Sequence, residues 1–275
     1  MSNPKMLEAL DGPAHIGSVS LNVRDLERAT AFYRDVLGLT IAETSATATS
    51  LAASDGTVLL NLIPRPELKP ANPSAPGLFH TAFLLPTRRD LANWVAHARS
   101  LGVMIEGASD HLVSEAIYLS DPEGNGIEIY VDRPRAQWGR DGAMVKMATA
   151  ALDGASLMAE QDRAAGPWRF PAAGRVGHVH LKVGDLAAAE AFYRDQLGMT
   201  VMARYPGAAF MSWGGYHHHI AINVWHSKGA PARDGESAGL AGVGLVMPAS
   251  AVRDTLVDPS GNRLATTPQA SASIS

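Results

Sequence analysis

Histidine and acidic side chains are the residues of this chain that could hold a metal ion or move protons. The sequence has ten histidines among 275 residues and no cysteine. Without cysteine there are no thiolate metal sites, iron–sulfur clusters, disulfides or cysteine nucleophiles, so any metal ion must be held by His, Asp or Glu. Histidine is also the usual proton shuttle near neutral pH. Several of the histidines gather in two short segments, His178 with His180 and the run His217, His218 and His219.

An internal repeat indicates which elements carry these side chains. Residues Val23 to Thr40 and Val183 to Thr200 are identical at 12 of 18 positions, with a constant offset of 160 residues. Each copy follows an alternating run that is typical of a strand. Asp25 and Asp185 then stand at the N-cap position of a helical apolar pattern that ends in Leu-Gly. Each copy is therefore predicted to be a strand, a helix and a glycine stop.

Short β-rich runs follow each copy and complete a βαβββ module. Another module begins at His80, with a helix near residues 88–101 and a closing strand near residues 126–131. Its last turn, DPEGNGIE at residues 121–128, recurs near the C-terminus as DPSGNRLA at residues 258–265. We therefore predict an α+β fold of four tandem βαβββ modules, the last of them degenerate because it is too short for a whole module.

The expected boundaries follow from these runs and from the linkers between them. They are module 1 at 1–66, module 2 at 77–132, a linker at 133–174, module 3 at 175–228, a truncated module 4 at 239–268 and a tail at 269–275. The Ala- and Met-rich stretch 144–161 of the linker is expected to form a helix on the outside of the fold.

Charge and hydropathy limit the partners. The net charge is −4, and the chain has no run of like charges of the kind that forms a nucleic-acid arm. It also has no apolar run long enough to span a membrane and no secretory signal at its start. We expect a cytoplasmic protein with no nucleic-acid or membrane partner.

A spaced motif lies between His111 and Glu128. His111 is followed by five residues, then by Ile117-Tyr118, Leu119-Ser120, the sequence Asp-Pro-Glu-Gly, three further residues and Glu128. This pattern resembles the signature of the type I extradiol enzymes, which are similar to catechol 2,3-dioxygenase. These belong to the vicinal oxygen chelate (glyoxalase/bleomycin resistance/dioxygenase) superfamily. One departure is Ser109, where glycine is commoner. The resemblance covers about residues 14–265 and implies that the modules pair into two curved half-barrels, with one divalent metal ion in a cleft.

In that family the metal ion takes a histidine from the first strand of each paired module and a glutamate from the last strand of one. The ligands that the resemblance implies are His80, His178 and Glu128. Module 1 has Ser18 at the matching position, and module 4 has no histidine at 239–248 and has Ala265 in place of the glutamate. We therefore expect modules 2 and 3 to pair around the site and modules 1 and 4 to form a metal-free half.

Two histidines and one carboxylate leave open positions on a divalent ion, as in non-haem Fe(II) oxygenases. The resemblance thus implies Fe(II), with Mn(II) possible, and a small aromatic diol and O2 as partners. Ring opening also needs acid–base groups near the metal. The resemblance offers His218, His111 and Tyr118 as catalytic residues. Neighbours on a strand alternate faces, so His217, His218 and His219 cannot all point into the cleft, whereas His180 shares the face of His178.

The function expected from the sequence is extradiol ring cleavage of a catechol-type aromatic with O2. One alternative is a glyoxalase-like isomerase or lyase, whose sites usually add a fourth protein ligand. The strand that would supply it, at 221–225, offers Asn223 but no carboxylate. Another alternative is a non-enzymatic binder of the same fold, which generally lacks the metal ligands. The shortened module 4 would leave a sheet edge, and this favours a homo-oligomer.

Overall fold

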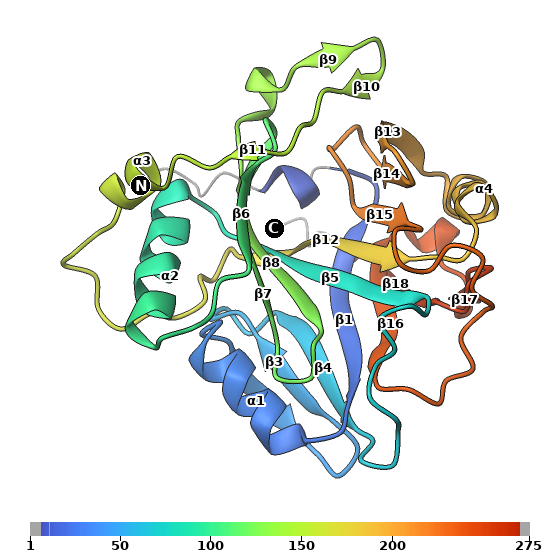
Figure 1. Ribbon diagram of the computed structural model, residues 1–275, viewed down its shortest axis with the longest axis horizontal. Coiled ribbons are helices and arrows are strands. Elements are labelled where there is room, and N and C mark those ends of the chain that lie inside the picture. Colours follow the sequence, from blue (N-terminus) through green and yellow to red (C-terminus); the bar gives the residue numbers. More distant parts are fainter. Residues whose placement is uncertain (1–6, 11, 270–275) are drawn as a thin grey trace, which may run out of the picture.

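Two curved β-sheets carry most of the fold in the computed structural model, which describes residues 7–10 and 12–269 (Figure 1). The predicted tail at 269–275 lies outside these residues, apart from Gln269. One sheet has seven strands in the order β17-β18-β16-β1-β4-β3-β2, and the other has nine in the order β11-β6-β7-β8-β5-β12-β15-β14-β13. A small sheet pairs β9 with β10.

The seven-stranded sheet is built from modules 1 and 4. Its strands are β1 (His15–Val23), β2 (Thr40–Thr44), β3 (Thr49–Ala52), β4 (Val58–Pro64), β16 (Gly239–Met247), β17 (Leu256–Val257) and β18 (Arg263–Pro268). The central contact is the antiparallel pair β1–β16, which joins strands more than 200 residues apart in the sequence.

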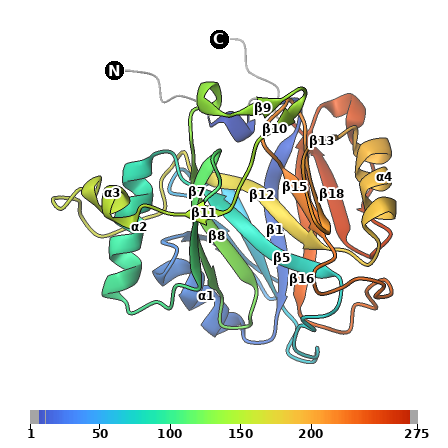
Figure 2. The same cartoon turned by 45° about the horizontal axis from the view of Figure 1, so that its top comes forward.

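The nine-stranded sheet is built from modules 2 and 3 and one linker strand. Its strands are β5 (Gly77–Leu84), β6 (Gly107–Asp110), β7 (Ser114–Ser120), β8 (Gly126–Asp132), β11 (Ala150–Ala151), β12 (Arg175–Lys182), β13 (Thr200–Tyr205), β14 (Ala208–Ser212) and β15 (Ile220–Asn223). Strands β5 and β12 join the two modules as an antiparallel pair, and they run side by side through the middle of the molecule (Figure 2). The modules thus pair as the sequence predicts.

Helices of the described residues cover the sheets from outside, and the three longest begin where the sequence predicts. They are α1 (Leu26–Asp35), α2 (Arg88–Ser100), α3 (Gly154–Ala159) and α4 (Leu186–Leu197), with short 3-10 helices η1 (Glu8–Leu10), η2 (Arg135–Gln137) and η3 (Ala249–Ala251). The Asp25 carboxylate accepts from the Arg28 amide, and the Asp185 carboxylate accepts from two amides of α4, so both are N-caps. Gly198 ends α4 in the left-handed conformation at φ 65°.

The expected helix at 144–161 is wrong for most of its length. Its first residues form β10 (Met144–Val145), which pairs with β9 (Arg140–Asp141), and β11 adds an edge strand to β6. Only the short α3 is helical. The Ala-rich composition favours a helix locally, but pairing with a preformed sheet edge and burial of Val145 decide the structure of this segment instead.

Alternation along the strands divides the residues of the nine-stranded sheet between two environments. In β8, Ile127 and Ile129 enter a hydrophobic core that also includes residues of the seven-stranded sheet, such as Leu21 and Leu245. Glu128 and Tyr130 point to the opposite, concave face, as expected for a period of two. The core face therefore holds the two sheets together, and the concave face holds polar residues beside a second, smaller hydrophobic cluster. No helix of the described residues is long and apolar enough to span a membrane.

Candidate metal centre

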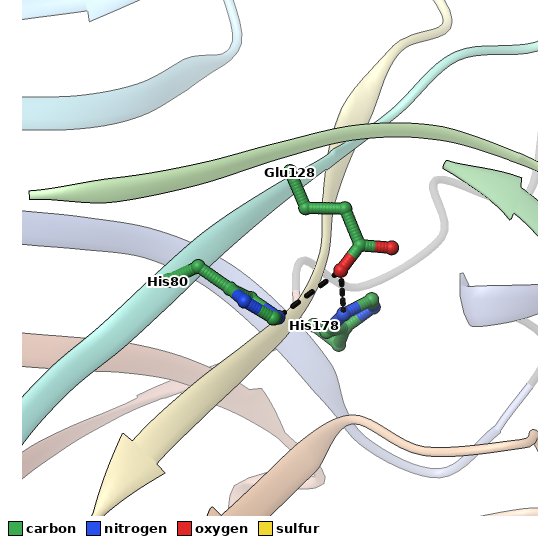
Figure 3. A group of neighbouring side chains, drawn as sticks. All are labelled: His80, Glu128 and His178. Carbon is green, nitrogen blue, oxygen red and sulfur yellow. Dashed lines mark hydrogen bonds and ion pairs between the residues drawn. The ribbon is translucent and has the colours of Figure 1, made fainter. Parts of the chain in front are cut away.

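Three buried side chains meet on the concave face of the nine-stranded sheet. They come from three adjacent strands, with His80 on β5, Glu128 on β8 and His178 on β12. The Nε2 atoms of His80 and His178 lie 3.1 and 3.2 Å from the same Oε2 atom of Glu128. Figure 3 shows both rings directed at this one oxygen. The three potential ligand atoms all lie within 4.8 Å of one another.

Strand register explains this convergence. Ala82 of β5 lies opposite His178 of β12 and beside Glu128 of β8, so the two side chains flank it on the same face. His80 is two residues before Ala82 and therefore shares that face. Tyr118 of β7 lies opposite Glu128 and extends the same row. A one-residue shift of any of these strands would move its ligand to the hydrophobic core.

The donor set fits a divalent metal ion. The carboxylate of Glu128 is only 3% exposed, and a buried charge is costly unless it is paired or bound to a metal. The Nε2 atom of His80 is buried and finds no hydrogen-bond partner among the described residues, although it faces Glu128. Neutral imidazoles and a carboxylate are the forms that bind metals.

The protonation states are those that a metal site needs. Burial lowers the pKa of His178 to about 4, so this ring is neutral at neutral pH. Burial raises the pKa of Glu128, but His178 and His80, which face the carboxylate, outweigh that effect and bring its pKa well below the usual range. The His178 imidazole and the Glu128 carboxylate are therefore in the forms that bind a metal ion.

A cavity of about 210 Å³ opens beside the three side chains and is lined mainly by aromatic and histidine residues. Its lining residues are Phe79, His80, Ser109, His111, Ser114, Tyr118, Glu128, Met147, Thr149, His178, His180, Tyr205, Phe210, His218 and Trp225. A larger cavity of about 580 Å³ meets it at Phe79, His80 and Tyr118. All three residues predicted to be catalytic, His111, Tyr118 and His218, line the smaller cavity.

His111 and Tyr118 form a hydrogen-bonded pair in the wall of the cavity. The Nδ1 atom of His111 donates to the Ala148 carbonyl at 2.7 Å. A neutral imidazole then has an acceptor at Nε2, so the Tyr118 hydroxyl donates to it at 2.6 Å. Burial, followed by the negative charge of Glu128, raises the pKa of Tyr118 well above its usual value. The phenol therefore stays protonated and offers its oxygen to the cavity.

The three consecutive histidines lie in the turn before β15 and point in different directions. His218 lines the cavity, with its ring centroid 4.0 Å from that of His178. His217 points away from the cavity, and its Nε2 atom lies 2.9 Å from Oδ1 of Asp132. His219 accepts from the Trp213 amide and donates to a backbone carbonyl of η1. Of the three, His218 is therefore the one placed to contact a ligand.

His180 lines the cavity, as its face predicts. The Nδ2 atom of Asn223 donates to the His180 Nε2 atom at 2.9 Å. The ring packs against Phe79 and Trp225, with centroid distances of 4.8 and 5.3 Å. Both polar atoms of the Asn223 side chain are thus engaged, since its Oδ1 atom accepts from the Trp225 amide.

Sequence reasoning missed some residues of the site. Met147 and Thr149 line the cavity, although the sequence predicts that the stretch 144–161 packs on the outside. Asp132 was also missed, although its spacing carried a signal, because Glu128, Tyr130 and Asp132 alternate along β8 and share one face.

Comparison with known proteins finds a family model and several dioxygenases that are similar to this chain. Residues 15–129 and 175–249 match the family model described as "Glyoxalase/Bleomycin resistance protein/Dioxygenase superfamily". A catechol-2,3-dioxygenase of Bacillus subtilis (strain 168) is 43% identical over 243 residues, covering 85% of this chain and 83% of the relative. Biphenyl-2,3-diol 1,2-dioxygenase 3 of Rhodococcus globerulus is 30% identical over 114 residues, covering 41% of this chain and 60% of the relative.

The fold has counterparts among solved structures. Glyoxalase I from Zea mays superposes with a TM-score of 0.56 at 15% identity, covering 94% of this chain and 93% of the other. This likeness concerns the arrangement of the modules and says nothing of the reaction.

Proposed function

Because the chain belongs to the glyoxalase/bleomycin resistance protein/dioxygenase superfamily, we propose that it is an extradiol dioxygenase that opens a catechol-type ring with O2 at an Fe(II) site. The chain is a homologue of a catechol-2,3-dioxygenase over most of its length, in agreement with the resemblance seen in its sequence. The observation that carries the proposal is the convergence of His80, His178 and Glu128 in a buried cavity.

His80, His178 and Glu128 would hold the metal ion. Divalent iron held by these residues would leave room for a chelating diol and O2 and would supply the redox chemistry that joins oxygen to the electron-rich ring. Mn(II) accepts the same donor set, and we propose Fe(II) because two histidines and one carboxylate are typical of non-haem Fe(II) oxygenases. Both atoms of O2 end in the product, and the carbon–carbon bond next to the hydroxyls breaks.

The surrounding residues bind and orient the diol. His218 is placed to accept a hydroxyl proton, since it lines the cavity beside His178. The Tyr118 oxygen is placed to accept a hydrogen bond from the other hydroxyl, and His111 holds the phenol in position. Phe79, Phe210 and Trp225 supply apolar walls that exclude water and contact the ring.

The glyoxalase-like isomerase is the alternative that a test must separate. Among the His, Asp and Glu side chains of the described residues, three and not four form the metal-ligating cluster, and Asn223 is engaged with His180. This favours the dioxygenase, since open positions are what O2 and a chelating diol require.

A homo-oligomer remains a prediction. Strand β17 forms one edge of the seven-stranded sheet, and its Val257 is 48% exposed. Edge strands of this kind are commonly covered by another chain or element. The mass of the protein in solution, measured by light scattering, tests the prediction.

Oxygen uptake tests the proposed function. The full-length protein is loaded anaerobically with Fe(II) and mixed with catechol, and O2 consumption and the ring-opened product are measured. We expect turnover in the native protein and a fall to background in His178→Ala. His97→Ala is the matched control, because His97 lies on α2, does not line the cavity and contacts a backbone carbonyl of α1. The proposal would be overturned if the protein isomerised a thiohemiacetal and consumed no O2 in the presence of catechol or aryl catechols.

A further inference from the structure

A chain of hydrogen bonds leads from the cavity into the protein behind His218. The Nδ1 atoms of His218 and His217 are 2.7 Å apart, and His217 Nε2 is 2.9 Å from Oδ1 of Asp132. The Tyr216 hydroxyl donates to both carboxylate oxygens of Asp132, at 3.1 and 3.0 Å. The Tyr130 hydroxyl completes the chain, 2.8 Å from that of Tyr216.

The Asp132 carboxylate determines which atom donates in the two hydrogen bonds between it and His218. Burial raises the pKa of Asp132 to about 7, and above that pH the ionised carboxylate only accepts, so the Nε2 atom of His217 carries a hydrogen. The ring of His217 is neutral, because burial lowers its pKa to about 3. Its Nδ1 atom is therefore an acceptor, and the Nδ1 atom of His218 must donate to it. The remaining nitrogen of His218, Nε2, is left with a lone pair on the side of the cavity.

We propose that Asp132 and His217 are positioning residues that hold His218 in the tautomer whose Nε2 lone pair accepts a proton from the diol. The inference rests on the proposed function, which supplies the diol. In this step the O–H bond of the diol breaks, its electron pair stays on oxygen, and the proton moves to His218 Nε2. The resulting imidazolium is stabilised by the Asp132 carboxylate, to which it is linked through His217.

Asp132, His217 and His218 form a relay, and the position of Asp132 links this relay to the metal centre. Glu128 and Asp132 are four residues apart on β8 and share the concave face. One strand therefore carries both a proposed metal ligand and the carboxylate that orients the proposed base. A single rigid element fixes the distance between the two functions.

Asp132→Asn is the diagnostic change, because it keeps the shape and removes the charge. The Tyr216 hydroxyl would still donate to the amide oxygen, which turns the amide NH2 toward His217. His217 must then accept at Nε2 and carry its hydrogen at Nδ1, so the Nε2 atom of His218 becomes a donor. We expect kcat to fall by about 10²–10⁴-fold, the usual contribution of general base catalysis, with a smaller change in KM.

The tautomers are read directly by long-range ¹H–¹⁵N NMR of the full-length protein labelled at histidine. The protein is loaded with diamagnetic Zn²⁺, which the same donor set accepts. Spectra are recorded near pH 8.5, because burial raises the pKa of Asp132 to about 7 and the carboxylate must be ionised. We expect His217 to carry hydrogen at Nε2 and His218 at Nδ1, and Asp132→Asn to exchange both assignments.

Tyr216→Phe is the matched control, because it keeps the ring against His217 and leaves the Asp132 carboxylate in place. We expect this variant to keep the native tautomers. Hydrogen at Nε2 of His218 in the native protein, or unchanged tautomers in Asp132→Asn, would overturn the relay. So would an Asp132→Asn enzyme whose kcat stays within threefold of the native value. None of the tautomer results depends on O2 uptake, so a native protein with the expected tautomers but no turnover would overturn the proposed function instead.

Discussion

The cavity beside the candidate metal centre offers hydrogen-bond acceptors to a ligand from two sides. The Tyr118 hydroxyl donates to His111, so its oxygen is left as an acceptor on one side. His218 presents a lone pair on the other side, if its Nδ1 atom donates to His217. A ligand that matches this cavity must bring its own protons, and an aromatic diol brings two. At the residue scale, the hydrogen-bond acceptors of the cavity therefore select the ligand together with the metal-ligating side chains.

Tyr118→Phe tests one side of this arrangement. The change removes an acceptor for the diol, and a hydrogen bond of this kind is worth about 0.5–1.5 kcal/mol. We therefore expect kcat/KM for catechol to fall by roughly 2- to 13-fold. Steady-state O2 uptake measures the change, with iron content measured in parallel. An unchanged kcat/KM at full iron content would contradict a contact between Tyr118 and the diol.

At the scale of elements, the linker between the two central modules is a wall of the cavity. Strand β11 pairs with β6, and the preceding Met147 and Thr149 reach the cavity. The Ala148 carbonyl between them fixes the tautomer of His111. A segment without counterpart in the repeated modules thus shapes the space in which a substituent of the diol must fit.

Met147→Ala is expected to widen this space. Loss of the side chain favours larger diols, and a change of a methylene or more in a pocket is worth about 1–3 kcal/mol of selectivity. The ratio of kcat/KM for biphenyl-2,3-diol to that for catechol should therefore rise by roughly tenfold. Met144→Ala, in the same linker but away from the cavity, is the matched control. An equal ratio in both variants would show that Met147 does not limit substrate size.

The repeated helices α1 and α4 contact the turns that lead into β8 and β18, the last strands of modules 2 and 4. The hydroxyl of Tyr33 on α1 donates to Asp121, in the turn before β8, and Tyr193 on α4 makes the same bond to Asp258, before β18. Both bonds are buried. The two motifs that identify the repeat in the sequence are therefore joined in space, each helix to the turn of the following module.

Tyr33→Phe and Tyr193→Phe form a matched pair. Each leaves a buried carboxylate with one donor fewer, and we expect each to lower the free energy of unfolding by about 1–3 kcal/mol in chemical denaturation. Only Tyr33→Phe should also weaken metal binding, because the turn at Asp121 leads to Glu128 whereas the turn at Asp258 leads to Ala265. Equal metal affinities in the two variants would contradict this role of the turn.

Some features of these strands and helices can be predicted from the sequence, and others cannot. Alternation along β8 predicts that Ile127 and Ile129 face the core and Glu128 the site, because a strand has a period of two. The repeat predicts the N-caps, and the family resemblance predicts the pairing of modules 2 and 3, because only these two keep metal ligands. Strand β11 is not predictable in this way, because two residues carry no periodicity and their conformation depends on the edge of β6. The contact between His217 and Asp132 joins segments 85 residues apart and required the three-dimensional structure.

At the scale of the whole molecule, one half of the chain encloses the other in sequence. Modules 1 and 4 bracket modules 2 and 3, and their sheet is closed by the β1–β16 pair. One hydrophobic core cluster contains Leu60 and Val243 of the seven-stranded sheet together with Phe83 and Val179 of the other. Neither sheet can lose its partner without exposing apolar surface, so the halves should unfold together.

This shared core predicts how the whole molecule responds to metal. Only modules 2 and 3 carry the proposed ligands, so one ion should bind per chain, yet the ion should stabilise both halves. An ion at 100 times its dissociation constant adds about 2.7 kcal/mol, which for a chain of this size corresponds to a rise in Tm of roughly 5–10 °C. Differential scanning calorimetry should show one transition that shifts as a unit in the native protein and does not shift in His178→Ala. Two transitions, of which metal moves only one, would mean that the sheets are independent and that the core between them does not couple their unfolding.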